Sequence, residues 1–404
     1  MKDGLSYEAQ KKDGCAVGFL CIRSKKAKTI SIATRGESRP MKTRYTRLCQ
    51  GLALALLACL CLSALAVAQD SANNGSVGRF VVIPPKPAAP GRLPTGTLQE
   101  WNGSFTYNNN TYPYVMVGTD PSTNTGSEIT TWIVPVKFVL SDGSTWDPLS
   151  GGPFSPVART AISPMFDGTT TYTQGGVDVG TTQYNDAFQR ANFWSIVQNN
   201  PNSHILLGGP TARVAILPEI TLNVPSGSGH QCNEFGIEVA CVDINYYDNQ
   251  VSAYMANSQT INPTGNPIFL AANMYWTEGG CCIGGYHSAN GPQTYNNFTY
   301  ITTPGVFSQD ISALSHEIGE WTDDPLYPNE NNTPCGILEV GDPLENGQPG
   351  HPFGTWAYQL HNFTYHMQDL VTLRYFGGPV NQPVNSFWTF QGYTGITSIC
   401  QNGS

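Results

Sequence analysis

The alternation of apolar and polar positions in the first half of the chain predicts β-strands. Residues 104–107 and 112–117 alternate on either side of an Asn-rich turn at 108–110, and residues 130–140 are rich in β-branched side chains. We therefore expect an antiparallel sheet in this region. Apolar or β-branched runs predict further strands later in the chain, at 213–217, 238–247 and 267–275.

A helical spacing of apolar positions predicts two helices. The first spans residues 184–199, and we interpret its aromatic side chains as core rather than as a ligand site. The second carries an apolar stripe over residues 311–321 and can be capped by Ser308 or Asp310. It ends at Asp324-Pro325, because the residue before a proline is disfavoured in a helix.

The first part of the chain has the pattern of an export signal. Basic residues follow Met41, an apolar run extends over residues 52–62, and the small residues Ala66 and Ala68 mark a cleavage site. No internal repeat or break in composition divides the later part of the chain. We expect four segments: 1–40, an upstream extension from a misassigned start site; 41–68, a signal peptide; 69–96, an unpacked proline-rich leader; and 97–404, a single α+β domain.

Two other interpretations of the apolar run stay open. Residues 52–67 could be a retained membrane anchor, although they are fewer than the about 20 apolar residues that a membrane span needs. The segment from Leu56 to Cys59 loosely resembles a lipoprotein box, which would tether the protein to a membrane. Cleavage after Ala68 predicts instead a secreted protein, extracellular or periplasmic, without stable membrane insertion.

The charge of the chain changes when this segment is removed. Twelve of the 20 Lys and Arg residues precede Gln69, against 4 of the 29 Asp and Glu residues, so 8 basic and 25 acidic residues remain and the formal charge is −17. No basic patch is left to contact phosphates, which makes nucleic acid an unsuitable partner. The acidic balance favours solubility and cation binding.

Six of the eleven cysteines follow the expected cleavage site, and an even number in an exported chain suggests disulfides. Cys232 and Cys241 flank a short loop that a hairpin disulfide could close. Cys281 and Cys282 are adjacent, and we expect them to bond to Cys335 and Cys400 rather than to each other. Zinc ligation by thiolates is disfavoured, because no Cys-x-x-Cys pair is present.

The second predicted helix carries the clearest chemical pattern, His316-Glu317-Ile318-Gly319-Glu320. Residues four apart share a helix face, so His316 and Glu320 can bind one ion, and Glu317 lies beside them as a candidate base. This is the arrangement of a zinc-protease helix whose second His is replaced by Glu. We therefore expect a zincin-like metal site within about residues 280–370.

Catalytic zinc requires three protein ligands and an open position. Glu339 follows Glu320 by 19 positions, close to the corresponding spacing in thermolysin-like enzymes, and is our preferred third ligand. Asp342 would then orient His316 through a hydrogen bond, although the reverse assignment stays open. Glu317 would take a proton from the attacking water and pass it to the leaving amine.

An oxyanion formed in such a site needs a hydrogen-bond donor. His287, Tyr365 and His366 are the candidates, and we place His287 and His366 with Glu317 in the predicted catalytic set. Two carboxylates and one His form a harder site than two His and one Glu, so Mn²⁺, Fe²⁺ or Ca²⁺ are alternatives to Zn²⁺. The same pattern could also be a solvated acidic face or a purely structural calcium site.

The motif helix and the segment after it resemble a known family. His316-Glu317-Ile318-Gly319-Glu320, Asp324-Pro325 and Glu339-Val340-Gly341-Asp342 are similar to the series in the plant EXORDIUM (phosphate-induced) proteins and in secreted bacterial proteins like them, as is the cysteine-plus-His stretch at 281–287. The resemblance covers residues 280–345. It implies secretion and a zincin-like site formed by His316, Glu317, Glu320 and an acidic residue of 339–342, and the plant members are associated with cell walls and growth signalling. Where the plant pattern continues to a Cys, this chain has Asp342-Pro343-Leu344, so its local disulfide would be rebuilt through Cys335.

These patterns together predict a secreted metal-dependent hydrolase, specifically a zinc metallopeptidase of His-Glu-x-x-Glu type. Its expected substrate is a peptide or protein, with extracellular wall material as a further candidate. The alternative is a non-catalytic extracellular or wall-associated binding protein that holds a structural metal. The substitution Glu317→Gln separates the two hypotheses, because only the enzyme needs the carboxylate as a base.

Overall fold

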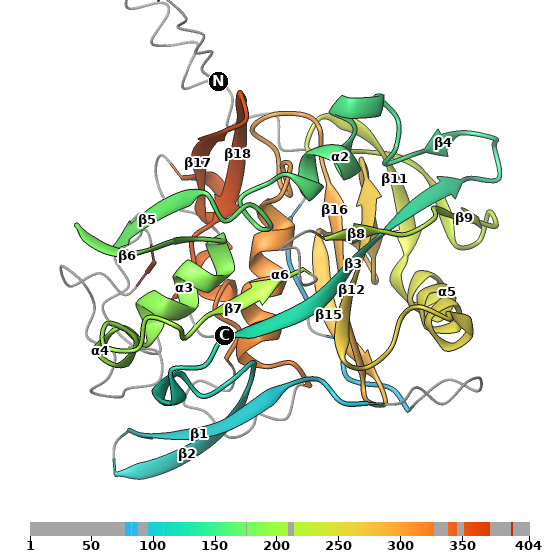
Figure 1. Ribbon diagram of the computed structural model, residues 1–404. Coiled ribbons are helices and arrows are strands. Elements are labelled where there is room, and N and C mark those ends of the chain that lie inside the picture. The colour runs from blue at the N-terminus through green and yellow to red at the C-terminus, as the bar shows by residue number, and fades with distance from the viewer. Residues whose placement is uncertain are drawn as a thin grey trace, which may run out of the picture. The chain divides into compact units, whose positions relative to one another are not determined.

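A computed structural model describes residues 77–81, 83–87, 96–107, 109–174, 176–208, 214–326, 338–345, 351–371 and 389–390. The expected signal peptide, the upstream extension, Cys335 and Cys400 lie outside these residues. The described part is rich in strands and has the α+β class that the sequence predicted (Figure 1). Within it, no helix is both long and apolar enough to cross a membrane.

A large mixed sheet forms the body of the protein. Its strands follow the order β15 (Gly285–Asn290), β16 (Gln293–Tyr300), β12 (Gly265–Ala272), β3 (Ser127–Val139) and β4 (Thr145–Trp146), and three short strands, β7 (Ile205–Leu207), β8 (Ala215–Ile216) and β9 (Ile220–Asn223), also pair with β3. The long strand β3 is parallel to β12, and β12 is parallel to β16, whereas β15 and β16 are antiparallel. Parallel pairing explains why β12 is a continuous apolar run, since such strands are buried on both faces.

Smaller sheets surround this body. One is a four-stranded sheet with the order β10 (Gly229–Glu234), β11 (Ile237–Asp243), β13 (Met274–Thr277) and β14 (Cys281–Ile283). The others are two-stranded hairpins: β1 (Glu100–Tyr107) with β2 (Asn110–Val117), β5 (Thr170–Gln174) with β6 (Val177–Thr182), and β17 (Thr355–Leu360) with β18 (Phe363–Gln368). The antiparallel pairing expected for residues 104–107 and 112–117 is confirmed, and β1 and β2 form a two-stranded sheet of their own. The expectation that residues 130–140 join the same antiparallel sheet is wrong, because β3 belongs to the large sheet and is parallel to β12.

The α-helices are α2 (Pro156–Ala161), α3 (Tyr184–Asn192), α4 (Trp194–Val197), α5 (Ile244–Asn257) and α6 (Ser312–Asp323), and 3-10 turns occur at Pro121–Thr123, Gly152–Phe154, Asp342–Leu344 and Pro352–Gly354. Helices α5 and α6 lie on opposite sides of the large sheet (Figure 1). Successive strand residues point to opposite faces. Ile133 and Ile268 therefore pack into the core beside α6, while their neighbours Val134 and Phe269 pack beside α5.

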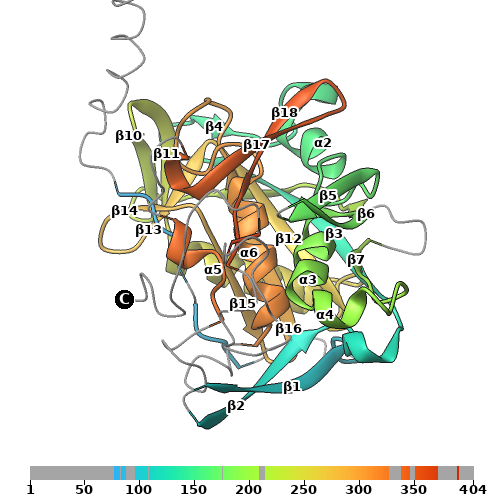
Figure 2. The same cartoon turned by 90° about the vertical axis from the view of Figure 1, so that its left-hand side faces the viewer.

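Helix α6 lies inside the protein rather than on its surface. It packs against β15, β16, β18, β2 and α3, and every residue from Ser312 to Asp323 is buried (Figure 2). The apolar stripe that the sequence predicted is confirmed, since Leu314, Ile318 and Trp321 are fully buried. The opposite side, which carries His316, Glu317 and Glu320, is also covered.

The start of α6 differs from the prediction. Ile311 occupies the N-cap position and no side chain makes a capping hydrogen bond there. The Asp310 carboxylate instead accepts hydrogen bonds from the backbone N–H of Ile311, at 2.5 Å, and from that of His366, at 2.8 Å. Asp310 thus links strand β18 to Ile311, the residue before α6, through hydrogen bonds.

The structure divides or shortens three other predicted elements, namely the helix at 184–199 and the strands at 238–247 and 267–275. The helix expected at 184–199 breaks at Phe193 into α3 and α4. The strand expected at 238–247 ends at Asp243, whose side chain accepts a hydrogen bond from Tyr246 N at 2.7 Å and caps α5. The run at 267–275 is split at Asn273, which has φ 49°, into strands of two different sheets.

Two described parts of the proline-rich segment, residues 77–81 and 83–87, are extended, as expected, but they pack against the body instead of lying unpacked. Arg79 and Lys86 form isolated parallel β-bridges with Ile283 and Asn290. Arg79 N donates to Cys282 O at 3.0 Å and Lys86 N to Ala289 O at 2.8 Å. Proline interrupts such pairing without preventing it at the edge of a sheet. Residues 77–81 and 83–87 therefore lie along β14 and β15.

The structure contains two disulfides in its described part. The expected hairpin disulfide Cys232–Cys241 is present between β10 and β11. The prediction for Cys281 and Cys282 is wrong, because these adjacent residues bond to each other. Their peptide bond is cis, and their Cα atoms are 3.1 Å apart.

Candidate metal centre

Three of the predicted site residues, His316, Glu317 and Glu320, lie on α6. Nε2 of His316 is 2.9 Å from Oε1 of Glu320 and 3.4 Å from Oδ1 of Asp342. Donors around a tetrahedral zinc ion are separated by about 3.4 Å when each bond is about 2.1 Å long. These three side chains therefore have the spacing of a ligand set.

The orientation of His316 is fixed by Gln368 at the end of β18. The Gln368 amide donates from Nε2 to the carbonyl of Gly341 at 2.8 Å, so its Oε1 faces His316 Nδ1 at 3.0 Å. His316 must then donate its proton from Nδ1, which leaves the Nε2 lone pair for a ligand. The sequence favoured Asp342 for this orienting role and left open that Asp342 is instead a ligand; in the structure Asp342 lies on the Nε2 side.

Glu320 is held by backbone groups of residues 341 and 342. The N–H groups of Gly341 and Asp342 both donate to Oε1 of Glu320, at 3.2 Å each. A Cβ atom on Gly341 would lie 2.3 Å from Nδ1 of His316. Only glycine allows the backbone to approach the imidazole this closely.

A second donor set is formed by His287 on β15, Glu320 and Glu339. Nδ1 of His287 is 3.9 Å from Oε2 of Glu320, and its Nε2 is 4.0 Å from Oε1 of Glu339. Neither carboxylate oxygen of Glu339 accepts a hydrogen bond from a residue that the structure describes, although the side chain is completely buried. A buried carboxylate without donors is costly and is the expected partner of a cation.

Glu317 lies between α6 and β15. Its Oε2 is 3.4 Å from Nδ1 of His287, while Oε1 has no hydrogen-bond partner among the described residues. The carboxylate fits there because position 285 is glycine, where a Cβ atom would lie 2.4 Å from Oε1 of Glu317.

Burial controls the protonation of the cluster. It raises the pKa of Glu317 and that of Glu339 well above the ordinary value for a glutamate, and neighbouring carboxylates raise the pKa of Glu339 further. Burial and the charge of His316 lower the pKa of His287 to about 3, so His287 is neutral. Burial alone would lower the pKa of His316, but Glu320 and Asp342 outweigh it and hold this pKa well above the usual range. In the absence of a cation, the positive charge of protonated His316 offsets part of the negative charge of Glu320 and Asp342.

The predicted donors Tyr365 and His366 make their contacts outside this cluster. Nδ1 of His366 is 2.7 Å from Oδ2 of Asp310, and the Tyr365 hydroxyl donates to Arg159 O at 3.0 Å. Strand β18 runs beside α6, so Gln368 reaches His316 while His366 lies beside the residue that precedes the helix. Both His366 and Asp310 line a separate cavity with Arg159.

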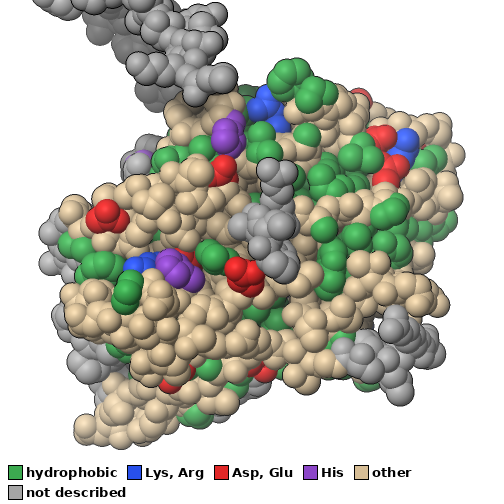
Figure 3. Space-filling model, viewed as in Figure 1, with side chains coloured by type: hydrophobic (Ala, Val, Ile, Leu, Met, Phe, Trp, Pro, Cys, Tyr) green, Lys and Arg blue, Asp and Glu red, His purple; other side chains and the backbone are tan. Residues whose placement is uncertain are grey.

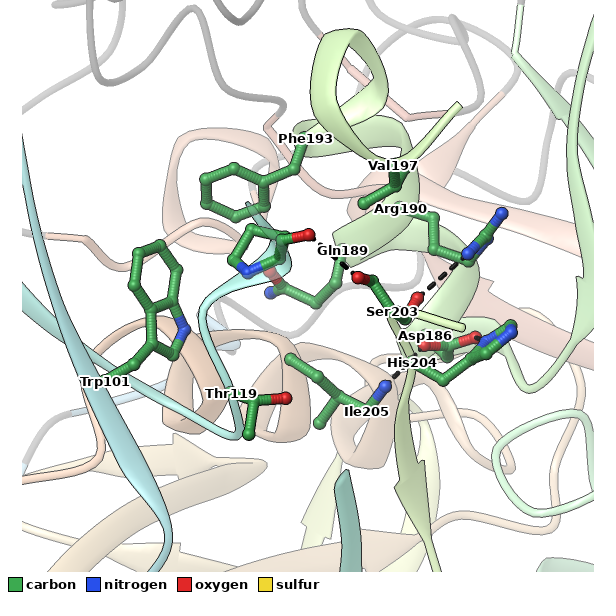
Figure 4. Close-up of a pocket in the computed structure, with 11 residues that line it drawn as sticks. Trp101, Thr119, Asp186, Gln189, Arg190, Phe193, Val197, Ser203, His204 and Ile205 are labelled. Carbon is green, nitrogen blue, oxygen red and sulfur yellow. Dashed lines mark hydrogen bonds and ion pairs between the residues drawn. The ribbon is translucent and has the colours of Figure 1, made fainter. Parts of the chain in front are cut away.

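Another hollow lies between α3, β7 and the hairpin β1–β2 (Figure 4). Asp186 accepts hydrogen bonds there from Ile205 N at 2.6 Å and from Thr182 Oγ1 at 2.7 Å, and it contacts His204 Nδ1 at 2.7 Å. Arg190 donates to the carbonyls of Val179 and Ser203. These polar groups bind one another and support the turn before β7, so we interpret the hollow as structural.

The face of the protein in Figure 3 carries few basic side chains, in small separate groups. Comparison of the chain with models of protein families, with curated proteins and with solved structures finds no match. The function must therefore be argued from the cluster itself. Its six side chains, His287, His316, Glu317, Glu320, Glu339 and Asp342, were all predicted from the sequence, whereas Gln368 was not.

Proposed function

We propose that this chain is a divalent-metal-dependent hydrolase of the zincin-like type, with Zn²⁺ as its metal and a peptide bond as its target. The observation that carries the proposal is the ligand spacing of His316, Glu320 and Asp342, at 2.9 Å and 3.4 Å, on a helix that also presents Glu317. The orphaned oxygens of Glu339 and Glu317 support a cation and a water molecule in the same place. The donor set thus fits zinc.

A divalent ion held by His316, Glu320 and Asp342 would polarise a substrate carbonyl and acidify a water molecule. Glu317 then accepts the proton of the attacking water and delivers it to the leaving nitrogen as the C–N bond breaks. His287 is the one member of the predicted donor trio that contacts Glu317, and it would stabilise the oxyanion.

An extracellular or periplasmic location agrees with the two disulfides, since such bonds persist mainly in oxidising compartments. A peptide or protein is the substrate that this chemistry favours. Extracellular wall material is a further candidate.

The burial of the site favours a second candidate function, a structural metal in a non-catalytic binding protein. Glu317 and Glu339 are completely buried, and only Asp342, with a side chain 35% exposed, opens the cluster to solvent. A closed site is typical of structural metals. In that case the ion would fasten α6 to the segment that contains Asp342.

The substitution Glu317→Gln separates these functions. The enzyme hypothesis predicts that cleavage of a peptide library falls by about 10²- to 10⁴-fold while the metal content stays at the wild-type level. The exposed Glu128→Gln variant is the matched control and keeps full activity. Unchanged cleavage by Glu317→Gln at full metal content would rule out the proposed mechanism. The structural hypothesis predicts that Glu317→Gln is silent, while His316→Ala lowers the melting temperature.

A further inference from the structure

Two sets of potential ligands meet at Glu320. The first consists of His316, Glu320 and Asp342, and the second of His287, Glu320 and Glu339; within each set one donor atom per residue lies within 4.8 Å of the others. The two oxygens of Glu320 point to different histidines, Oε1 to His316 and Oε2 to His287. This is the arrangement of a carboxylate that bridges two ions.

A single ion does not account for both sets. Its donors can be no more than about 4.2 Å apart when each bond is about 2.1 Å long. Among the described residues, His287 and His316 never occur together in a set whose donor atoms all lie within 4.8 Å, and neither do His316 and Glu339. One ion at His316 would leave the buried carboxylate of Glu339 without a cation.

We infer that the site holds two divalent cations bridged by Glu320, one bound by His316 and Asp342 and the other by His287 and Glu339. This inference rests on the metal-binding part of the proposed function. The first set is compact and matches tetrahedral spacing, while the contacts of the second set are 3.9 Å and 4.0 Å long. The first ion therefore binds more tightly than the second. His287 serves as a ligand in such a centre and does not act as the oxyanion donor.

To test this, the purified full chain is stripped of metal with a chelator and titrated with Zn²⁺ in an isothermal calorimeter. The zinc that stays bound after gel filtration is then measured by elemental analysis. The expected result is two equivalents of zinc bound in two resolved steps. One equivalent at saturation would overturn the inference. Titration in 0.5 M salt, with Glu128→Gln beside the wild type, excludes ions bound loosely to the acidic surface.

Two single substitutions assign the steps. Glu339→Gln removes the weaker step and Asp342→Asn the tighter one, each leaving one equivalent, whereas Glu320→Gln weakens both steps. Loss of the same step in Glu339→Gln and Asp342→Asn would contradict two separate ions. Circular dichroism verifies that each variant is folded, and the wild-type stoichiometry tests the inference without any variant.

The outcome also separates this inference from the proposed function. One zinc equivalent together with Glu317-dependent peptide cleavage would overturn the inference and leave the function standing. Two equivalents without any cleavage would support the inference and overturn the proposed hydrolase. Substitution with Co²⁺ gives an independent readout, since two ions bridged by one carboxylate are magnetically coupled and two distant ions are not.

Discussion

The ring of Phe80 stacks on the imidazole of His316, with centroids 3.8 Å apart and an angle of 28° between the planes. The backbone N–H of Phe80 donates to Oε2 of Glu345 at 3.1 Å, and the side chain is only 7% exposed. Burial, with a smaller effect from Asp342, raises the pKa of Glu345 to about 7. Residues 77–81 thus cover one face of the His316 ring.

The first prediction concerns this cover. Phe80→Ala should lower the free energy of unfolding by about 3 kcal/mol, as for other buried Phe→Ala changes, and should accelerate the removal of zinc by a chelator because the imidazole becomes accessible. Stopped-flow measurement of zinc release checks the second effect. Val77→Ala in the same segment is the control, since Val77 is 65% exposed. An unchanged release rate in Phe80→Ala would mean that the ring does not guard the site.

The second prediction concerns Gln368, which fixes the tautomer of His316. Gln368→Leu removes both the contact to His316 and the hydrogen bond to Gly341, so the affinity for zinc should fall by about 10- to 100-fold. Competition with a chromophoric chelator measures this change. Gln359→Leu, an exposed position on the same hairpin, should keep the wild-type affinity. Equal affinities for the two variants would contradict the orienting role.

The third prediction uses the close packing of Gly341. Its φ is −92°, which any residue can adopt, so Gly341→Ala acts only through its new methyl group. That group would lie 2.3 Å from Nδ1 of His316 and must displace either the ring or the loop. Zinc affinity should fall, while Gly227→Ala, at a position with open space, should leave it unchanged. A Gly341→Ala variant with wild-type zinc affinity would show that the loop does not lie against the ring.

The sequence predicted the part of the site that depends on local spacing. His316 and Glu320 share a helix face because they are four residues apart. Gln368 could not be found in this way, because it reaches His316 only through the pairing of β17 with β18 and the packing of β18 on α6. The same reason applies to Phe80, whose proline-rich surroundings indicated an unpacked leader.

For the fold, as for the site, the sequence predicted the elements that follow from local patterns. The hairpin β1–β2 and the apolar run of β12 follow from alternation and from apolar continuity. Helix α5 was missed because its residues, rich in Tyr and Asn, directly continue the strand pattern of β11, and only the cap at Asp243 marks the change. The fully buried position of α6 depends on long-range packing, which local patterns do not encode.

The fourth prediction links the metal to stability. The ligands come from α6, β15 and the segment at 338–345, so a bound ion connects parts that are distant in the sequence. At free zinc 100-fold above its dissociation constant, the folded state should gain about 2.7 kcal/mol. Thermal unfolding with and without a chelator checks this gain. A melting temperature that does not respond to zinc would contradict the role of the ion as a link between these segments.

Metal binding by His316, Glu320 and their neighbours is tested best by elemental analysis of the purified protein. The wild type and Glu128→Gln should each contain at least one equivalent of a divalent transition metal, and Glu320→Gln should lose it. If the folded wild type contains no more metal than Glu320→Gln, even after incubation with zinc, these residues do not form a metal site.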